Sequence, residues 1–438
     1  MRITVNPREM IIGSALRRVG PVLWNGAAFE CDPNRPARLN DLVIGEIIEA
    51  PNTYEVGAPN WIERLYPGEL PGRVTIACEP LRKGAFIGVI GNRYAPPYLL
   101  GGLQDPVTRQ PNGEIRGGSI AEGLFGANCV GFVNLASSEF PRARVRVEGV
   151  LIDRRRRPLN LRDFREPLEL PQTNCSGDSK RVLVAGYSSD AGKTVTARAL
   201  VRELTSSGLR VTFEKKSGTA CCRDWLSCFP ESGLESPEEG SSPAREIDIR
   251  EFPARDFVDG LGVVSDVSIA IRTFTRESGV YTESFVAQRS PDFHVMELAD
   301  NIAHGPNWAL LRDPGFGSRL SAIIYCPLPR IESVLHFLSF LRSTLGLRDL
   351  PVVLSGPLAN EARFEIVRRE VQARCRVPIA PSARLRTSGW EPEGKDLAEA
   401  LLEAMTARGR PVRSKRAWAP PRTKRPSPPA EREAGSDG

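Results

Sequence analysis

Residues 182–196 read VLVAGYSSDAGKTVT, an apolar run that gives way to small and polar residues and then to Gly-Lys-Thr. Phosphate-binding loops of this kind follow a strand and are written as glycine, four residues, then Gly-Lys-Ser or Gly-Lys-Thr. Here five residues separate Gly186 from Gly192. The N–H groups of a loop that leads into a helix point at an anion, and the helix dipole adds to the attraction. The stretch therefore predicts a phosphate-binding loop that is one residue longer than usual.

Each position in this loop has an expected role. Lys193 would bridge the β- and γ-phosphates, and the Thr194 hydroxyl would bind Mg²⁺. The alternative is a plain Gly/Ser turn between a strand and a helix, but Gly-Lys-Thr directly after an apolar strand favours the phosphate loop. The predicted nucleotide contacts are Gly186, Ser189, Asp190, Ala191, Gly192, Lys193, Thr194 and Val195.

From Arg181 onward, short apolar runs alternate with helical patterns, which is typical of an α/β fold with a doubly wound parallel sheet and helices on both faces. The segment 193–208 places Val195, Ala199, Leu200 and Leu204 near one helical face and ends at a glycine. The expected strands are 181–187, 209–216, 293–300, 320–328, 350–358 and 377–381, and the further expected helices are 330–346, 360–375 and 394–409.

The front half of the chain has a different composition and pattern. It is rich in glycine and proline, and turn signals separate short β-type runs every eight to twelve residues or so, which indicates a small barrel or sandwich. We therefore expect a β-rich N-terminal domain at 1–165, a linker at 166–180 and the α/β domain at 181–409. Within the latter, 230–246 is expected to be a mobile surface insertion, and 410–438 a disordered tail.

Composition limits the class of protein and its partners. The chain has 438 residues, 41% apolar and 26% charged, with a formal charge of +6, which fits a two-domain soluble protein. Much of the positive charge lies after Arg410 and in Arg154–Arg157, which is expected to be a solvated hairpin turn, with a phosphate- or nucleic-acid-binding run as the alternative. Nucleic acid is therefore not an expected partner. No apolar run approaches the ~20 residues of a membrane span, and the start lacks a signal-peptide pattern, so the expectation is a cytoplasmic protein without a membrane partner.

Cysteine and histidine give weaker signals. The nine cysteines are scattered and are interpreted as reduced thiols. Cys221, Cys222 and Cys228 match no common zinc spacing, and whether they have a function stays open. His304 is a candidate acid or base, with a surface-loop position as the alternative, and His336 is expected in the core because it follows an apolar helical pattern.

A family resemblance adds to this interpretation. Glycine, five residues and Gly-Lys-Thr is how the loop is written in dethiobiotin synthetase, and GYSSDAGKT resembles that loop in spacing, in its mid-loop acid and in its small residues. The resemblance implies a SIMIBI-class P-loop NTPase over about residues 181–385, in which the phosphate-loop strand neighbours the strand that carries the Walker B acid. Partitioning ATPases of this class carry an extra lysine where this chain has Ser188, so the resemblance favours the ligase-like branch. The whole chain also looks like two-domain bacterial ATP-binding proteins with a β-rich front half.

The same resemblance implies catalytic lysines. After its second strand the family has a lysine followed shortly by Thr-Gly, and FEKKSGTACCRD supplies Lys215, Lys216 and a Ser-Gly-Thr turn in the comparable place. Lysines at this end of a strand would stabilise a developing acyl or carbamoyl phosphate. Lys216 is the preferred candidate because it lies nearer the turn. The alternative is a pair of solvated lysines at a strand end.

Acidic residues are the candidate metal ligands. The segment FHVMELADN, a candidate for the fourth strand, ends in Glu297 and Asp300, and the family places an acid here that holds Mg²⁺ or its water. An acid at the end of an apolar strand is costly to bury without a positive partner, which favours a functional role. Asp259, between Asp256 and Asp266 in a glycine-containing stretch, would face metal or substrate, with an ordinary acidic turn as the alternative.

Together these features predict an ATP-dependent enzyme that uses Mg²⁺. The leading hypothesis is a ligase-like enzyme that phosphorylates a carboxylate or carbamate of a small-molecule substrate. The alternatives are an NTP-hydrolysing regulator or chaperone that acts on a protein partner, and a nucleotide-binding protein with negligible turnover. The sequence leaves open the substrate, ATP against GTP, a homodimer, and the role of the N-terminal domain, in which Asn92, Arg93 and Tyr94 form a candidate specificity patch.

Overall fold

The computed structural model describes the chain in parts. These are residues 1–4, 10–13, 28–50, 73–74, 83–95, 99–105, 108, 110–124, 129–136, 142–164, 179–189, 191–218, 282–283, 286–287, 290–303, 305–386 and 389–407. Several predictions fall outside them: Asp190, Asp259, His304, the cysteines Cys221, Cys222 and Cys228, the insertion 230–246 and the tail 410–438.

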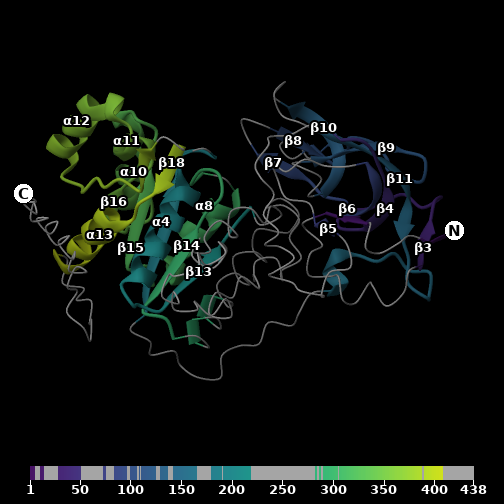
Figure 1. Ribbon diagram of the computed structural model, residues 1–438, viewed down its shortest axis with the longest axis horizontal. Helices are drawn as coiled ribbons and strands as arrows, with labels where there is room; N and C mark the ends of the chain where they lie inside the picture. The colour runs from purple at the N-terminus through teal and green to yellow at the C-terminus, as the bar shows by residue number, and fades with distance from the viewer. Residues whose placement is uncertain are drawn as a thin grey trace, which may run out of the picture.

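The front half contains one eleven-stranded, mostly antiparallel sheet within the described residues. Its strands are β1 Arg2–Thr4, β2 Ile11–Ile12, β3 Ala28–Asp32, β4 Leu42–Glu49, β5 Arg73–Val74, β6 Gly84–Val89, β7 Arg93–Ala95, β8 Leu99–Gly102, β9 Ile120–Gly123, β10 Cys129–Ala136 and β11 Ala143–Leu151, and the short helix η2 Leu161–Phe164 follows (Figure 1). The sheet runs β6-β4-β11-β9-β10 and curls back on itself, because Ile90 just after β6 pairs with Val130 of β10. The expectation of a β-rich front half is confirmed, since the described part of it forms a mostly antiparallel sheet.

Alternation explains why β11 forms where it does. Val145 and Val147 are buried, whereas Arg144 and Arg146, which alternate with them, are exposed and pair with glutamates of the neighbouring strand β4. The predicted solvated turn is also confirmed, since residues 154–157 are all exposed. Its geometry is fixed by Asp153, which accepts hydrogen bonds from the backbone N–H groups of residues 155 and 157 at 2.8 Å.

The back half is built on a five-stranded parallel sheet in the order β13-β14-β12-β15-β16. The strands are β12 Lys180–Gly186, β13 Val211–Lys215, β14 Phe293–Glu297, β15 Ala322–Cys326 and β16 Val352–Leu354. The helical segments are α4 Lys193–Ser206, α8 Gly305–Arg312, α9 Pro314–Gly317, α10 Ile331–Ser339, η4 Phe340–Thr344, α11 Pro357–Asn360, η5 Ala362–Phe364, α12 Glu365–Cys375 and α13 Lys395–Ala407.

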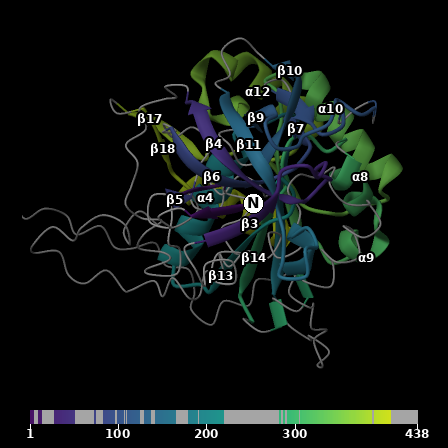
Figure 2. The ribbon, with the colours of Figure 1, turned by 90° about the vertical axis from the view of Figure 1, so that its right-hand side faces the viewer.

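Helices cover both faces of this sheet, as predicted. On one face, α4 and α13 pack with alternate residues of the strands, among them Val184 and Val295. On the other face, α8, α10 and α12 pack with the intervening residues, among them Leu183 and Met296. Figure 2 shows α8, α9 and α10 grouped on one side of the molecule. Because parallel strands buried on both faces carry apolar residues at every position, their sequence reads as short continuous apolar runs.

Three local expectations need correction. The predicted helix 330–346 is regular only to Ser339 and continues as a π-helical turn. His336 is exposed rather than in the core, because α10 buries Val334, Phe337 and Leu338 and the histidine lies outside that face. The expected strand at 377–381 does not form, since Ile379 makes only an isolated bridge with Leu354. A hairpin of β17 Ala383–Arg386 and β18 Gly389–Pro392 precedes α13 and had no clear sequence signal. No helix in the described part of the chain is long and apolar enough to cross a membrane.

Candidate functional site

The loop between β12 and α4 is shaped by two glycines. Gly192 has φ +78, a left-handed conformation that suits glycine, and it stands directly before α4. Gly186 is required for a different reason. A Cβ added there would lie 2.8 Å from Cγ of Lys193 and 3.1 Å from Cβ of Ala191. The early glycine that the sequence raised as an oddity therefore makes room for the stem of the loop lysine.

The start of α4 is available for an anion. No side chain caps this helix end, and the first N–H groups of a helix have no partner inside the helix. Lys193 is only 3% exposed, and its ammonium donates to the carbonyl oxygens of Ser188 at 2.5 Å and Ser189 at 3.4 Å. Burial, with the nearby charge of Lys215, lowers the pKa of Lys193. A bound polyphosphate would offset both effects, since a negative charge favours the protonated amine.

The strand register brings an acid and a second lysine to the same place. Glu297 lies opposite Val184 of β12 and opposite Lys215 of β13. Side chains that are paired across parallel strands share a face, and Val184 belongs to the face covered by α4. Glu297 and Lys215 therefore point to the α4 side at the carboxyl ends of their strands, where the phosphate loop begins. The phosphate-loop strand and the acid-bearing strand are neighbours, as the resemblance implies.

These groups are in direct contact. Oε1 of Glu297 accepts from the Thr194 hydroxyl at 2.9 Å and from the Lys215 ammonium at 2.6 Å. Both side chains of the ion pair are nearly inaccessible, with exposures of 4% for Lys215 and 0% for Glu297. A cation and a hydroxyl on one oxygen favour the charged form of a buried carboxylate. Lys193, Thr194, Lys215 and Glu297 thus form one constellation.

The donor set fits a magnesium ion carried by a nucleotide. Such ions take one or two protein ligands and complete their shell with phosphates and water. The Thr194 hydroxyl and the Glu297 carboxylate already meet at hydrogen-bond distance, and both are the oxygen ligands that Mg²⁺ prefers. Among the described residues no group of three or more His, Cys, Asp or Glu side chains gathers as a metal centre.

The third predicted ligand, Asp300, lies on the loop after β14. Its carboxylate accepts a hydrogen bond from the Ser189 hydroxyl of the phosphate loop, and its φ of +49 is a left-handed conformation that aspartate tolerates better than most residues. Asp300 therefore contacts the loop itself, whereas Glu297 contacts Thr194 at the start of the helix. The structure places both acids beside the predicted phosphate site.

A buried asparagine that we did not single out from the sequence holds this acidic loop. Asn307 of α8 is 0% exposed and donates to the carbonyl oxygens of Ala299 at 2.6 Å and Asn301 at 2.9 Å. Its own side-chain oxygen accepts from Ser217 at 2.6 Å. The asparagine thus ties the chain after Lys215 to the loop that carries Asp300. A lone asparagine in a helical segment gives no sequence signal for this role.

Lys216, the preferred catalytic lysine from the sequence, lies elsewhere. Its ammonium is 0% exposed, 2.7 Å from Oε1 of Glu214, and also contacts the Thr282 hydroxyl. Oε2 of Glu214 accepts from Thr282 and bonds Nε2 of His294, each at 2.9 Å. Neither the solvated alternative nor a phosphate contact describes this side chain. Its catalytic role stays a prediction without support from its contacts, and Lys215 occupies the position expected of such a lysine.

The remaining predicted residues divide into two groups. Ala191 is buried in the loop and Val195 is half-buried at the first turn of α4, so Val195 does not share the core face of Ala199, Leu200 and Leu204. In the front half, Asn92 is buried and accepts from the backbone N–H of Gln104 at 3.1 Å, which is a structural contact. Asp190, Asp259 and the side chains of Arg93 and Tyr94 lie outside the description.

Comparisons with known proteins add little to this geometry. No family model matches the sequence, and no curated protein matches it. Among solved structures, the chain is similar to chloroplast FtsY from Physcomitrella patens (12% identity, TM-score 0.28, 55% of this chain and 70% of that one). It is also similar to the signal recognition particle receptor FtsY from Elizabethkingia anophelis (12%, 0.30, 53% and 68%) and to a DUF1611 family protein from Anabaena variabilis (13%, 0.31, 57% and 64%). At such TM-scores these likenesses carry no argument about this chain.

Proposed function

We propose that this chain binds a nucleoside triphosphate with Mg²⁺ and transfers its γ-phosphoryl group to a carboxylate or carbamate of a small molecule. The observation that carries the proposal is the convergence of Lys193, Thr194, Lys215 and Glu297 beside an uncapped helix start. A phosphate loop alone would serve simple hydrolysis. A second buried lysine at the same place is suited to an additional anion on the transferred phosphoryl group or its acceptor.

The chain's own residues would divide the work as follows. The N–H groups at the start of α4 and the Lys193 ammonium hold the β- and γ-phosphates. Thr194 and Glu297 hold the Mg²⁺, which when bound neutralises charge on the phosphates. Lys215 would leave Glu297 and neutralise the acceptor carboxylate and the transferred group. Asp300 holds the phosphate loop through Ser189.

The first half of the reaction needs only the nucleotide and the acceptor. An oxygen of the acceptor forms a bond to the γ-phosphorus as the bond to the β-phosphate oxygen breaks, so that the nucleoside diphosphate leaves. A nucleophile, an amine nitrogen or another group, would then attack the acyl or carbamoyl carbon, inorganic phosphate would leave with the bonding electrons, and the nucleophile would lose its proton to water. ATP is the proposed donor, and a small-molecule acid the proposed partner.

The test is phosphate release from ATP by the full chain, with and without a panel of small carboxylic acids, and GTP in parallel. We expect release that depends on one acid or a related group of acids. Lys193→Ala should abolish nucleotide binding or turnover, because the phosphates lose their main cation, while Lys83→Ala, which changes an exposed lysine, serves as the matched control. Wild-type behaviour of Lys193→Ala would overturn the nucleotide site. Stimulation by a protein partner alone would overturn the ligase-like reaction and favour a regulator.

A further inference from the structure

A cavity lies far from the phosphate loop. It has a volume of about 300 Å³ and opens at the amino end of the edge strand β16. The strands of this sheet are parallel, and the phosphate loop follows the carboxyl end of β12. The cavity is therefore at the opposite end of the sheet, and nothing proposed for the nucleotide site involves it. Its size is at the lower limit of small-molecule sites, which start at roughly 300 Å³.

The walls are apolar and come from three separate parts of the chain. They belong to the end of α10 and the turn that follows it, to β16 with the segment after α12, and to the last turns of α13. The main apolar residues are Leu338, Leu341, Leu347, Leu350, Val352 and Val377. Sites for small ligands combine such walls with a few polar groups that fix orientation.

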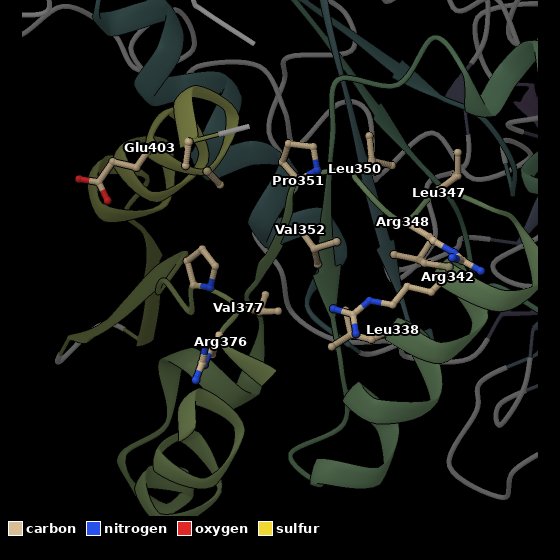
Figure 3. Close-up of a pocket in the computed structure, with 14 residues that line it drawn as sticks. Leu338, Arg342, Leu347, Arg348, Leu350, Pro351, Val352, Arg376, Val377 and Glu403 are labelled. Atoms are coloured by element: carbon tan, nitrogen blue, oxygen red, sulfur yellow. The ribbon is translucent and has the colours of Figure 1, made fainter. Parts of the chain in front are cut away.

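The polar groups at this cavity are mainly positive. Arg342, Arg348 and Arg376 line it, with Glu403 as the acidic residue among those that line it. Figure 3 shows the Arg342 guanidinium directed between Val352 and Leu338 toward Val377, while the Glu403 carboxylate points away from it. An arginine that projects across apolar walls can bind a carboxylate through two parallel N–H donors.

The Arg342 guanidinium has no competing partner among the described residues. It forms no ion pair and no side-chain hydrogen bond there, and the same holds for Arg348 and Arg376. By contrast, Arg369 and Arg374 on the nearby helix α12 each pair with a glutamate one turn away. A basic residue near a helix end can serve to bind the last carbonyl groups, but Arg342 makes no such bond. Because Arg342 is also exposed, its donors are available to a ligand that arrives from solvent.

We propose that this cavity binds a small amphipathic carboxylate, with the apolar body against Val352, Val377 and Leu338 and the carboxylate on Arg342. Charge decides against a neutral apolar ligand, because the Arg342 guanidinium would lie beside it without a counter-ion. The apolar walls decide against a small inorganic anion, since they offer no donors for the rest of its surface. This proposal is independent of the proposed reaction.

The test is calorimetric titration of the full chain with octanoate, which has both features, and with 1-octanol and acetate, which have one each. We expect saturable one-to-one binding of octanoate and association at least about tenfold weaker for the other two, since a charge-assisted pair contributes that much or more. Equal binding of 1-octanol would overturn the role of the charge. Absence of saturable octanoate binding up to about 10 mM, a range that covers weak ligands, would overturn the site.

Variants locate the site. Arg342→Gln should weaken octanoate association about tenfold or more, and Arg342→Lys should restore part of the loss because it keeps the charge. Arg330→Gln, which changes an exposed arginine at the other end of α10, should leave octanoate binding unchanged. Lys193→Ala should also leave it unchanged. Displacement of octanoate by ATP, or equal binding by Arg342→Gln, would place the ligand elsewhere and overturn the proposal.

Discussion

Lys215 and Lys216 are adjacent in the sequence and both buried, yet they belong to different parts of the molecule. Lys215 points to the α4 face and reaches Glu297 at 2.6 Å beside the phosphate loop. Lys216 reaches Glu214 at 2.7 Å on the opposite side, in a cluster with Thr282 and His294. At the end of a strand, one residue of such a pair can meet a ligand and the other is directed into the fold.

The two ion pairs also differ in what surrounds them. The Glu297 pair includes the Thr194 hydroxyl and lies beside Lys193, in a position where an incoming phosphate could replace the carboxylate as partner of Lys215. The Glu214 pair has its second oxygen on Thr282 and His294 and is entirely enclosed. We therefore expect the first pair to matter for turnover and the second for stability.

The largest expected effect is on stability, from Lys216→Met. Removing one partner of a buried pair leaves an uncompensated charge, which costs about 3–5 kcal/mol. Urea unfolding should show this loss, and the double variant Glu214→Gln with Lys216→Met should recover most of it. Lys83→Met, at an exposed position, is the control. A small stability loss accompanied by a large loss of turnover would mean that Lys216, and not Lys215, serves the nucleotide site.

Acid should weaken the same cluster. Burial alone would raise the pKa of Glu214, but Lys216 and His294 outweigh burial and lower the pKa to about 2. Because the folded pKa lies below the unfolded value of about 4.5, this group's stabilisation is complete above pH 4.5 and is lost as the pH falls toward 2. The loss is on the order of 3 kcal/mol. Burial lowers the pKa of His294. The stability that this neutral histidine contributes is therefore also lost as the pH falls below about 6.5. Unfolding at several pH values should show both losses, and the double variant should lack the lower one.

Turnover should separate the two lysines most directly. Lys215→Met removes a cation that the proposed reaction uses, and we expect a fall in phosphate release of about 100-fold. Lys216→Met, measured per folded molecule, should stay within a few-fold of wild type. The comparison between the two lysines would be wrong if both variants lost turnover equally while their folded fractions were the same.

The smallest expected effect concerns Asn307, which connects the chain after Lys215 to the loop that carries Asp300. Asn307→Ala leaves the Ser217 hydroxyl and two loop carbonyls without their buried partner, which costs about 1–3 kcal/mol. Nucleotide affinity should fall more in the presence of Mg²⁺ than in EDTA, because the acidic loop that carries Asp300 loses its support. A fluorescent nucleotide titration measures both. An equal fall in the two conditions would make Asn307 a purely structural residue.

Much of the back half could be predicted because its signals are local. The strand at 180–186 and the helix from Lys193 follow from apolar runs and from Gly-Lys-Thr, and α13 lies within two residues of its expected bounds. The prediction of a core position for His336 was wrong, because apolar neighbours in the sequence do not say which face of a helix is buried. The preference for Lys216, which its contacts do not support, rested on its distance from a turn along the chain, and that distance carries no information on direction.

The sequence by itself determined the phosphate loop, since the glycines, the lysine and the threonine that it needs are consecutive and their spacing is a property of the chain. Only the tertiary structure decided which lysine faces that loop, that Glu297 shares its carboxylate with Thr194 and Lys215, and that Asn307 holds the acidic loop. The reason is physical. Strand register and helix placement set these contacts across roughly 80 to 100 intervening residues, and such pairings depend on how the whole sheet packs.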